Sequence, residues 1–143
     1  MTSFDEYQQL CKQTDKCTML YCKCETCNGA GEIFVLLDDS MQQCSTCKGE
    51  GYIELPWAYP TIGLAGETGE VTEKIKKTIR DDGGIMQPER KDLLLKELGD
   101  CLWYIAMISE KNGIKLSEVA EANLDKLFSR KERGVLSGDG DLR

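Results

Sequence analysis

Two pairs of acidic residues, each with a spacing of three, stand in the second half of the chain. Glu67 and Glu70 belong to GLAGETGEVTEK at positions 63–74, and Glu97 and Asp100 belong to KELGDCLWYIAMI at positions 96–108. Residues three apart are neighbours on a helix, so each pair predicts two carboxylates on one helix face. Two such helices packed antiparallel would bring four carboxylates to one point. Carboxylate oxygens are ligands for hard cations such as Mg²⁺ or Mn²⁺.

Each pair has a second interpretation as part of a solvated helix face. For the first pair, Glu70 and Lys74 would then form an ordinary ion pair four residues apart. The second pair favours metal binding because its helix continues into an apolar run from Cys101 to Ile108, which predicts a helix buried nearly all round. Carboxylates there are costly unless they are paired or bind metal. Gly66 and Gly69 weaken the first helix, which indicates either close helix packing or room for a ligand.

Four cysteines form a second chemical site, in two copies of CxxCxGxG at positions 24–31 and 44–51. Paired CxxC turns supply four thiolates for a tetrahedral zinc ion, and the glycines let backbone amides approach the sulfurs. The sequence therefore predicts a structural Zn²⁺ rather than a redox-active pair or iron. Its ligands would be Cys24, Cys27, Cys44 and Cys47. Cys22 lies near enough to compete with Cys24, but it and the remaining cysteines are expected to be free thiols.

The composition limits the classes of function. The 143 residues include 18 basic and 25 acidic ones, for a formal net charge of −7, and no histidine, which excludes His-based acid–base chemistry. The basic residues are scattered, so a nucleic-acid partner is not expected. The uncharged helical stretch from Cys101 to Ser109 is too short for a membrane span, and no secretory signal precedes the cysteines. We expect a cytoplasmic protein with no membrane partner.

The elements that position these residues follow from periodicity. A capping box at Ser3 and Glu6 predicts a helix over about 4–13, and β-rich runs at 33–37 and 52–55 flank a turn at 38–40. An apolar stripe from Leu64 to Ile79 predicts a helix that ends at Gly83-Gly84. Two more helices are expected from Pro88 to about 111, and from an N-cap at Ser117 to about 133. The fold is predicted to be mainly α, an antiparallel helical bundle with a small β-rich zinc-knuckle insertion. Its parts would be a first helix (1–15), the insertion (16–56), the main helices (57–135) and a flexible or partner-bound tail (136–143).

The two acidic segments, followed by LSEVAEANLDKLFSRKERG at 116–134, resemble the MazG-like all-α nucleoside triphosphate pyrophosphohydrolases, which carry ExxE on one helix and ExxD on the next. The resemblance covers about residues 1–13 and 57–143. It implies Mg²⁺-dependent cleavage of a nucleoside triphosphate to the monophosphate and pyrophosphate, in nucleotide pool control or house-cleaning, by a homodimer or homotetramer. Carried over by position, Glu67, Glu70, Glu97 and Asp100 would be the catalytic metal ligands.

The chain departs from the family pattern at Gly66, where many members have a glutamate credited with activating water. Glu73, a further three residues along from Glu70, is one alternative base, and activation of water by the metal alone is another. Asn123, Lys126 and Arg130 share one face of the last helix, where they would either bind substrate phosphates or form a solvated surface.

The CxxCxGxG copies resemble those of the DnaJ cysteine-rich domain, which has four copies and two zinc ions. Two copies imply one zinc ion here. This module also suggests an alternative function for the whole chain, a non-catalytic zinc adaptor that binds a protein or nucleic-acid partner.

Overall fold

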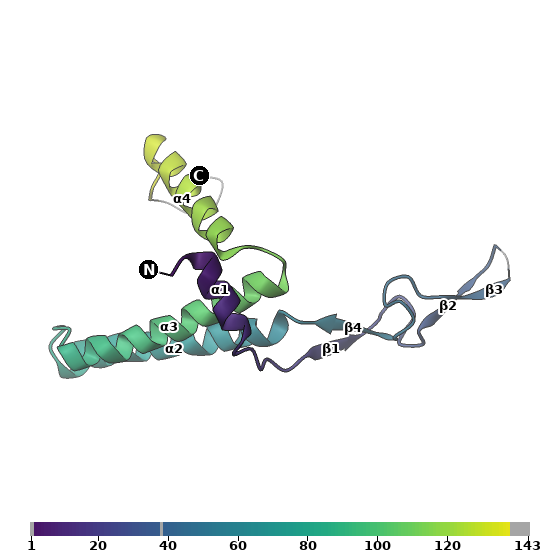
Figure 1. The fold of residues 1–143 in the computed structure, drawn as a ribbon, viewed down its shortest axis with the longest axis horizontal. Helices are drawn as coiled ribbons and strands as arrows, with labels where there is room; N and C mark the ends of the chain where they lie inside the picture. Colours follow the sequence, from purple (N-terminus) through teal and green to yellow (C-terminus); the bar gives the residue numbers. More distant parts are fainter. Residues whose placement is uncertain (1, 38, 138–143) are drawn as a thin grey trace.

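A computed structural model describes residues 2–37 and 39–137, and this part of the chain forms four helices and four short strands. In chain order they are α1 (Phe4–Lys12), β1 (Leu20–Lys23), β2 (Glu32–Val35), β3 (Ser40–Gln43), β4 (Tyr52–Leu55), α2 (Ala58–Asp81), α3 (Pro88–Lys111) and α4 (Leu116–Glu132). The helices α2 and α3 lie side by side along their length, α1 crosses α3, and the strands form an arm that projects beyond one end of the pair (Figure 1). The predicted fold class, mainly α with a small β insertion, is confirmed.

The helix α1 begins at the predicted capping box. Glu6 donates its backbone N–H to Ser3 Oγ at 3.2 Å, and Ser3 donates its N–H to Glu6 Oε2 at 2.8 Å, which satisfies two amides that a helix start leaves open. Tyr7 and Cys11 pack against Ala106 and Met107 of α3. This small core fixes α1 on the second half of α3.

Only the second half of α3 is as buried as predicted. The run from Cys101 to Ile108 is buried or half-buried, as expected. The preceding half is not, because Leu95 is 69% exposed and Leu98 49% exposed. The expectation of a helix buried nearly all round is therefore wrong for a single chain, since α1 covers only the second half. Ile79, at the end of the apolar stripe of α2, is likewise 65% exposed.

The start of α4 corrects another prediction. Ser117 is a helical residue and not the N-cap, because the helix begins at Leu116. Ser117 donates its N–H and its hydroxyl to the Asp5 carboxylate of α1, each at 3.1 Å. The Gln8 side chain holds the preceding loop, since it donates to Ile114 O at 2.9 Å and accepts from Leu116 N–H at 2.8 Å. Contacts with α1, which local sequence does not reveal, thus set where α4 starts.

The arm consists of two antiparallel strand pairs. The pair β1–β4 runs from Leu20 opposite Leu55 to Lys23 opposite Tyr52, and β2–β3 runs from Glu32 opposite Gln43 to Val35 opposite Ser40. β4 coincides with the predicted run 52–55 and β2 overlaps the predicted run 33–37, whereas β1 and β3 were not predicted. Of the predicted turn, Asp38 lies outside the described residues and Ser40 already belongs to β3; residues 138–143 of the predicted tail also lie outside them.

Two polar contacts fasten the base of the arm to α3. Trp103 donates its indole N–H to Thr14 Oγ1 at 2.8 Å, and Lys111 forms an ion pair with Asp15. None of the described helices is both long enough and apolar enough to cross a bilayer.

Candidate active site and metal centres

The helices α2 and α3 bring three of the four predicted carboxylates together. One oxygen from each of Glu67, Glu97 and Asp100 lies within 4.8 Å of the other two, and we call these residues the acidic group. Glu67 and Glu97 are half-buried and Asp100 is exposed. The spacing of three on α3 puts Glu97 and Asp100 on one face, and the antiparallel packing of α2 places Glu67 against them.

Like charges lie close together around Glu67. Burial raises the pKa of Glu67, and the charges of Asp100, Glu97 and Glu70 raise it further. These oxygen donors, close to one another and of like charge, fit a hard divalent ion such as Mg²⁺ or Mn²⁺.

Glu70, the fourth predicted ligand, is outside the acidic group and bound to a lysine. Lys74 Nζ lies 3.2 Å from Glu70 Oε2 and 2.9 Å from Glu97 Oε1, so it joins α2 to α3. The hydrogen bond with Glu97, followed by that with Glu70, raises the pKa of Lys74. Sequence spacing identified the pair with Glu70, but the second partner, on another helix, was missed.

Glu73 is not brought to the acidic group. Its carboxylate forms ion pairs with Lys76 and, at 3.1 Å, with Lys77. The hydrogen bond from Lys76, followed by that from Lys77, holds the pKa of Glu73 below its usual value. A carboxylate of lowered pKa is a weaker base.

The three predicted substrate-binding residues stand on α4, which extends away from the α2–α3 pair (Figure 1). Asn123 and Lys126 are exposed, whereas Arg130 is only 5% exposed. A single chain thus does not bring them to the acidic group.

Two glycines of α2, Gly66 and Gly69, border open space. A Cβ added at Gly66 or Gly69 would meet nothing within 4 Å in the described part of the chain. Of the two predicted explanations, close helix packing therefore does not hold within one chain, and the space beside Glu67 stays open.

The four predicted zinc ligands form a second cluster, buried in the arm. All four Sγ atoms lie within 4.8 Å of one another, with Cys24 and Cys44 3.8 Å apart and Cys27 and Cys47 3.6 Å apart. A zinc tetrahedron with Zn–S bonds of about 2.3 Å has edges of about 3.8 Å, so the sulfurs fit this ion. Cys22 is exposed on β1, and neither it nor Cys17 belongs to the cluster.

The two CxxCxGxG copies are related by matching hydrogen bonds. Cys24 donates its N–H to Gly51 O at 3.0 Å, and Cys44 donates to Gly31 O at 2.8 Å. The N–H groups of Gly31 and Gly51 also lie 3.3 Å from the Sγ of Cys27 and Cys47, respectively. A Cβ at Gly31 would come 2.3 Å from Gly49 O, and one at Gly51 would come 2.4 Å from Gly29 O. Only glycine allows the two copies to approach this closely.

Backbone amides favour the thiolate form of Cys44 in this cluster. The N–H of Cys47, helped by that of Thr46, lowers the pKa of Cys44 to about 6, whereas burial raises the pKa of Cys47 to about 11. All eight cysteines lie in the described residues, and none of them forms a disulfide. All four thiols of the cluster are therefore available as ligands for a thiophilic metal ion.

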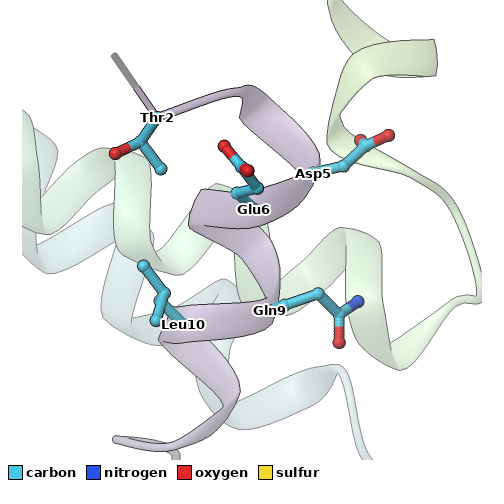
Figure 2. A pocket seen from close by; sticks show the side chains of 5 residues that line it. All are labelled: Thr2, Asp5, Glu6, Gln9 and Leu10. Atoms are coloured by element: carbon cyan, nitrogen blue, oxygen red, sulfur yellow. The ribbon is translucent and has the colours of Figure 1, made fainter.

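An open hollow of about 680 Å³ lies against α1, away from both clusters. It is lined by Thr2, Asp5, Glu6, Gln9 and Leu10, and Asp5 points toward α4 (Figure 2). None of the predicted site residues lines it. The two groups of candidate metal ligands, the acidic group and the thiol cluster, therefore lie outside this hollow.

Comparison with known proteins agrees with the placement of the acidic group. The MazG nucleotide pyrophosphohydrolase domain matches residues 61–135, which contain both acidic pairs. The Gene 37 protein of Mycobacterium phage L5 is 48% identical over 86 residues, a match that covers 60% of this chain and 75% of that protein. No solved structure matches the chain. With more than half of its length in the match, the chain belongs to the MazG nucleotide pyrophosphohydrolase family.

Proposed function

We propose that the chain is a cytoplasmic nucleoside triphosphate pyrophosphohydrolase that depends on Mg²⁺ or Mn²⁺. Water and a nucleoside triphosphate would give the monophosphate and pyrophosphate, in nucleotide pool control or house-cleaning. The observation that carries this proposal is the convergence of Glu67, Glu97 and Asp100 from two helices, with ligand oxygens within 4.8 Å of one another. Membership of the MazG family supports the same reaction.

The acidic group would hold the divalent ions, with Glu70 as the predicted fourth ligand. When bound, such ions neutralise the phosphate oxygens and offset charge on the leaving pyrophosphate. The chain contributes by keeping the carboxylates together on two long helices. For activation of water, the ion pairs of Glu73 favour the alternative that needs no separate base.

We propose further that the active form is a homodimer or homotetramer. Large apolar side chains are exposed on all three main helices, among them Ile62, Ile79, Leu95 and Phe128. A second copy packed on these faces would bury them. It would also let the exposed Asn123 and Lys126 reach the phosphates from a neighbouring subunit. Arg130, only 5% exposed, would have to leave its buried position to do the same.

The thiol cluster would hold one structural Zn²⁺ through Cys24, Cys27, Cys44 and Cys47. A site with four protein thiolates has no open position for substrate, so the ion would shape the arm and take no part in hydrolysis.

A second candidate function is the zinc adaptor. Leu36 is 87% exposed and Leu37 99% exposed in the connection from β2 to β3, which favours contact with an apolar protein surface there. This function would stand alone only if the acidic group were inert.

The deciding experiment is pyrophosphate release from a panel of ribo- and deoxyribonucleoside triphosphates with Mg²⁺. Products are identified by phosphorus NMR, because monophosphate with pyrophosphate and diphosphate with phosphate give different spectra. Turnover that Glu97→Gln abolishes, while helicity is retained, supports the proposal. If zinc-loaded protein turns over no nucleotide with Mg²⁺ or Mn²⁺, the hydrolase assignment is wrong and the adaptor is favoured.

A further inference from the structure

Lys74 occupies a position unlike that of the other lysines of α2. Its ammonium contacts a carboxylate on each of two helices, Glu70 at 3.2 Å and Glu97 at 2.9 Å. The side chains of Lys74 and Glu97 are only 16% and 17% exposed. Lys77, one turn further along α2, contacts Glu73 of its own helix and is 38% exposed. Lys74 is therefore a half-enclosed charge between two helices and not a surface ion pair.

The contact with Lys74 also explains why Glu70, alone among the four predicted ligands, lies outside the acidic group. Three carboxylates form the acidic group, and Glu70 is outside it with its oxygen on Lys74. Glu97 belongs to the acidic group and shares the ammonium with Glu70. The positive charge of Lys74 thus lies where Glu70 and the acidic group meet, which is where a cation shared by all four carboxylates would be held.

We propose that Lys74 is a positioning residue that acts as the internal counter-ion of the metal-free site, and that the divalent ion displaces it from Glu70 and Glu97. This inference rests on the proposed metal-dependent function. An ammonium and a divalent ion compete for the same carboxylate oxygens, and the ion of higher charge wins when it is present. Displacement frees Glu70 to turn from Lys74 to the metal and complete the set of four.

Removal of the Lys74 ammonium is expected to strengthen metal binding. Replacing a residue that merely supports the site weakens metal binding. Replacing a competitor strengthens it, because the metal no longer has to break two ion pairs. For pairs of this partial exposure we expect Lys74→Met to lower the dissociation constant for Mn²⁺ about fivefold or more. Lys74→Arg keeps the cation and is expected to stay within about twofold of the wild type.

The experiment titrates Mn²⁺ into full-length, zinc-loaded protein without nucleotide, and follows free Mn²⁺ by its electron paramagnetic resonance signal. Zinc loading keeps the thiol cluster occupied, and Mn²⁺ prefers oxygen ligands. Lys77→Met is the matched control, since it removes the same charge from the same helix but leaves the acidic group untouched. Glu97→Gln shows which binding belongs to the acidic group. Lys74→Gln repeats the test with a second neutral side chain, in case Lys74→Met does not fold.

Tighter Mn²⁺ binding in Lys74→Met and Lys74→Gln, with Lys77→Met unchanged, supports the inference. Equal or weaker binding in both neutral variants, beside a wild type that binds Mn²⁺ through Glu97, overturns the role of Lys74 and leaves the proposed function intact. If no variant binds Mn²⁺ in a manner that depends on Glu97, the proposed metal-dependent function itself fails and this inference fails with it.

Discussion

The ring of Tyr104 lies directly against the backbone of Gly63, so closely that a Cβ on Gly63 would fall 2.2 Å from Tyr104 Cε1. Gly63 is one turn before Glu67 on α2, and Tyr104 is one turn after Asp100 on α3. The contact therefore fixes the spacing of the two helices immediately beside the acidic group.

Two neighbouring glycines of α2 are expected to respond to alanine in opposite directions. Gly63→Ala meets the Tyr104 ring and should lower the free energy of unfolding by about 1–3 kcal/mol. Gly66→Ala meets open space and should raise it by about 0.5–1 kcal/mol, because glycine disfavours the helix. Urea denaturation of the metal-free protein measures both. Equal effects at the two positions would contradict the packing described for α2 and α3.

Removal of a carboxylate from the acidic group should stop hydrolysis while the fold is kept. We expect Glu97→Gln and Asp100→Asn each to reduce kcat about 100-fold or more, because each side chain would hold the catalytic metal. Glu89→Gln is the matched control, an exposed glutamate in the first turn of the same helix, and should leave kcat unchanged. Steady-state assays at saturating Mg²⁺ provide the measurement. A large loss in Glu89→Gln would point to a general effect of charge.

Zinc should be bound once per chain and only by the thiol cluster. Cys24→Ser and Cys44→Ser are expected to lose the ion, whereas Cys22→Ser, on the exposed face of β1, should retain it. The helical circular dichroism signal should persist after zinc removal, because the apolar core of the arm is separate from that between α1 and α3. Metal analysis after dialysis gives the stoichiometry. Zinc lost from Cys22→Ser would mean that the ligand set is wrong.

The ion pair at the base of the arm predicts how one variant behaves with pH. Burial raises the pKa of Asp15, but hydrogen bonds from Lys111 and from the N–H of Cys17 outweigh it and hold this pKa below its usual value. A depressed carboxylate pKa adds stability above the unfolded pKa of about 3.9, and this stability is lost as pH falls below that value.

Asp15→Asn should therefore lower the free energy of unfolding by about 1 kcal/mol at pH 7, and the difference from wild type should shrink as the pH falls below about 4. Asp125→Asn, at an exposed position on α4, serves as the control and should show little difference at either pH. Chemical denaturation at several pH values tests both variants. A difference that grows on acidification would have the wrong sign for this ion pair.

Local patterns in the sequence were enough for most of the helical scaffold, for three carboxylates that converge and for the four clustered cysteines. The capping box at Ser3 and the proline at position 88 mark helix starts through contacts within one turn, and both are where they were predicted. The cysteine spacing likewise places four sulfurs in one cluster. Each helix start and each CxxCxGxG copy is a local feature, which a sequence displays directly.

The features that were missed depend on partners far away in the sequence. Ser117 is not an N-cap because Asp5, on another helix, takes its N–H and hydroxyl. The strands β1 and β3 are each only four residues long, and they form through pairing with β4 and β2. Lys74 has the spacing of an ordinary pair with Glu70, and only the packing of α3 reveals its second contact with Glu97.

The pairing of Leu20 with Leu55 has a consequence for how such a chain can be assembled. The arm lies between α1 and α2 in the chain. Its first and last strand residues are paired with each other, so its two ends are close together. An insertion whose ends are close together can be added, replaced or deleted as one unit. After a deletion, a short turn would join α1 to α2. The helical scaffold and the acidic group would keep their connectivity throughout.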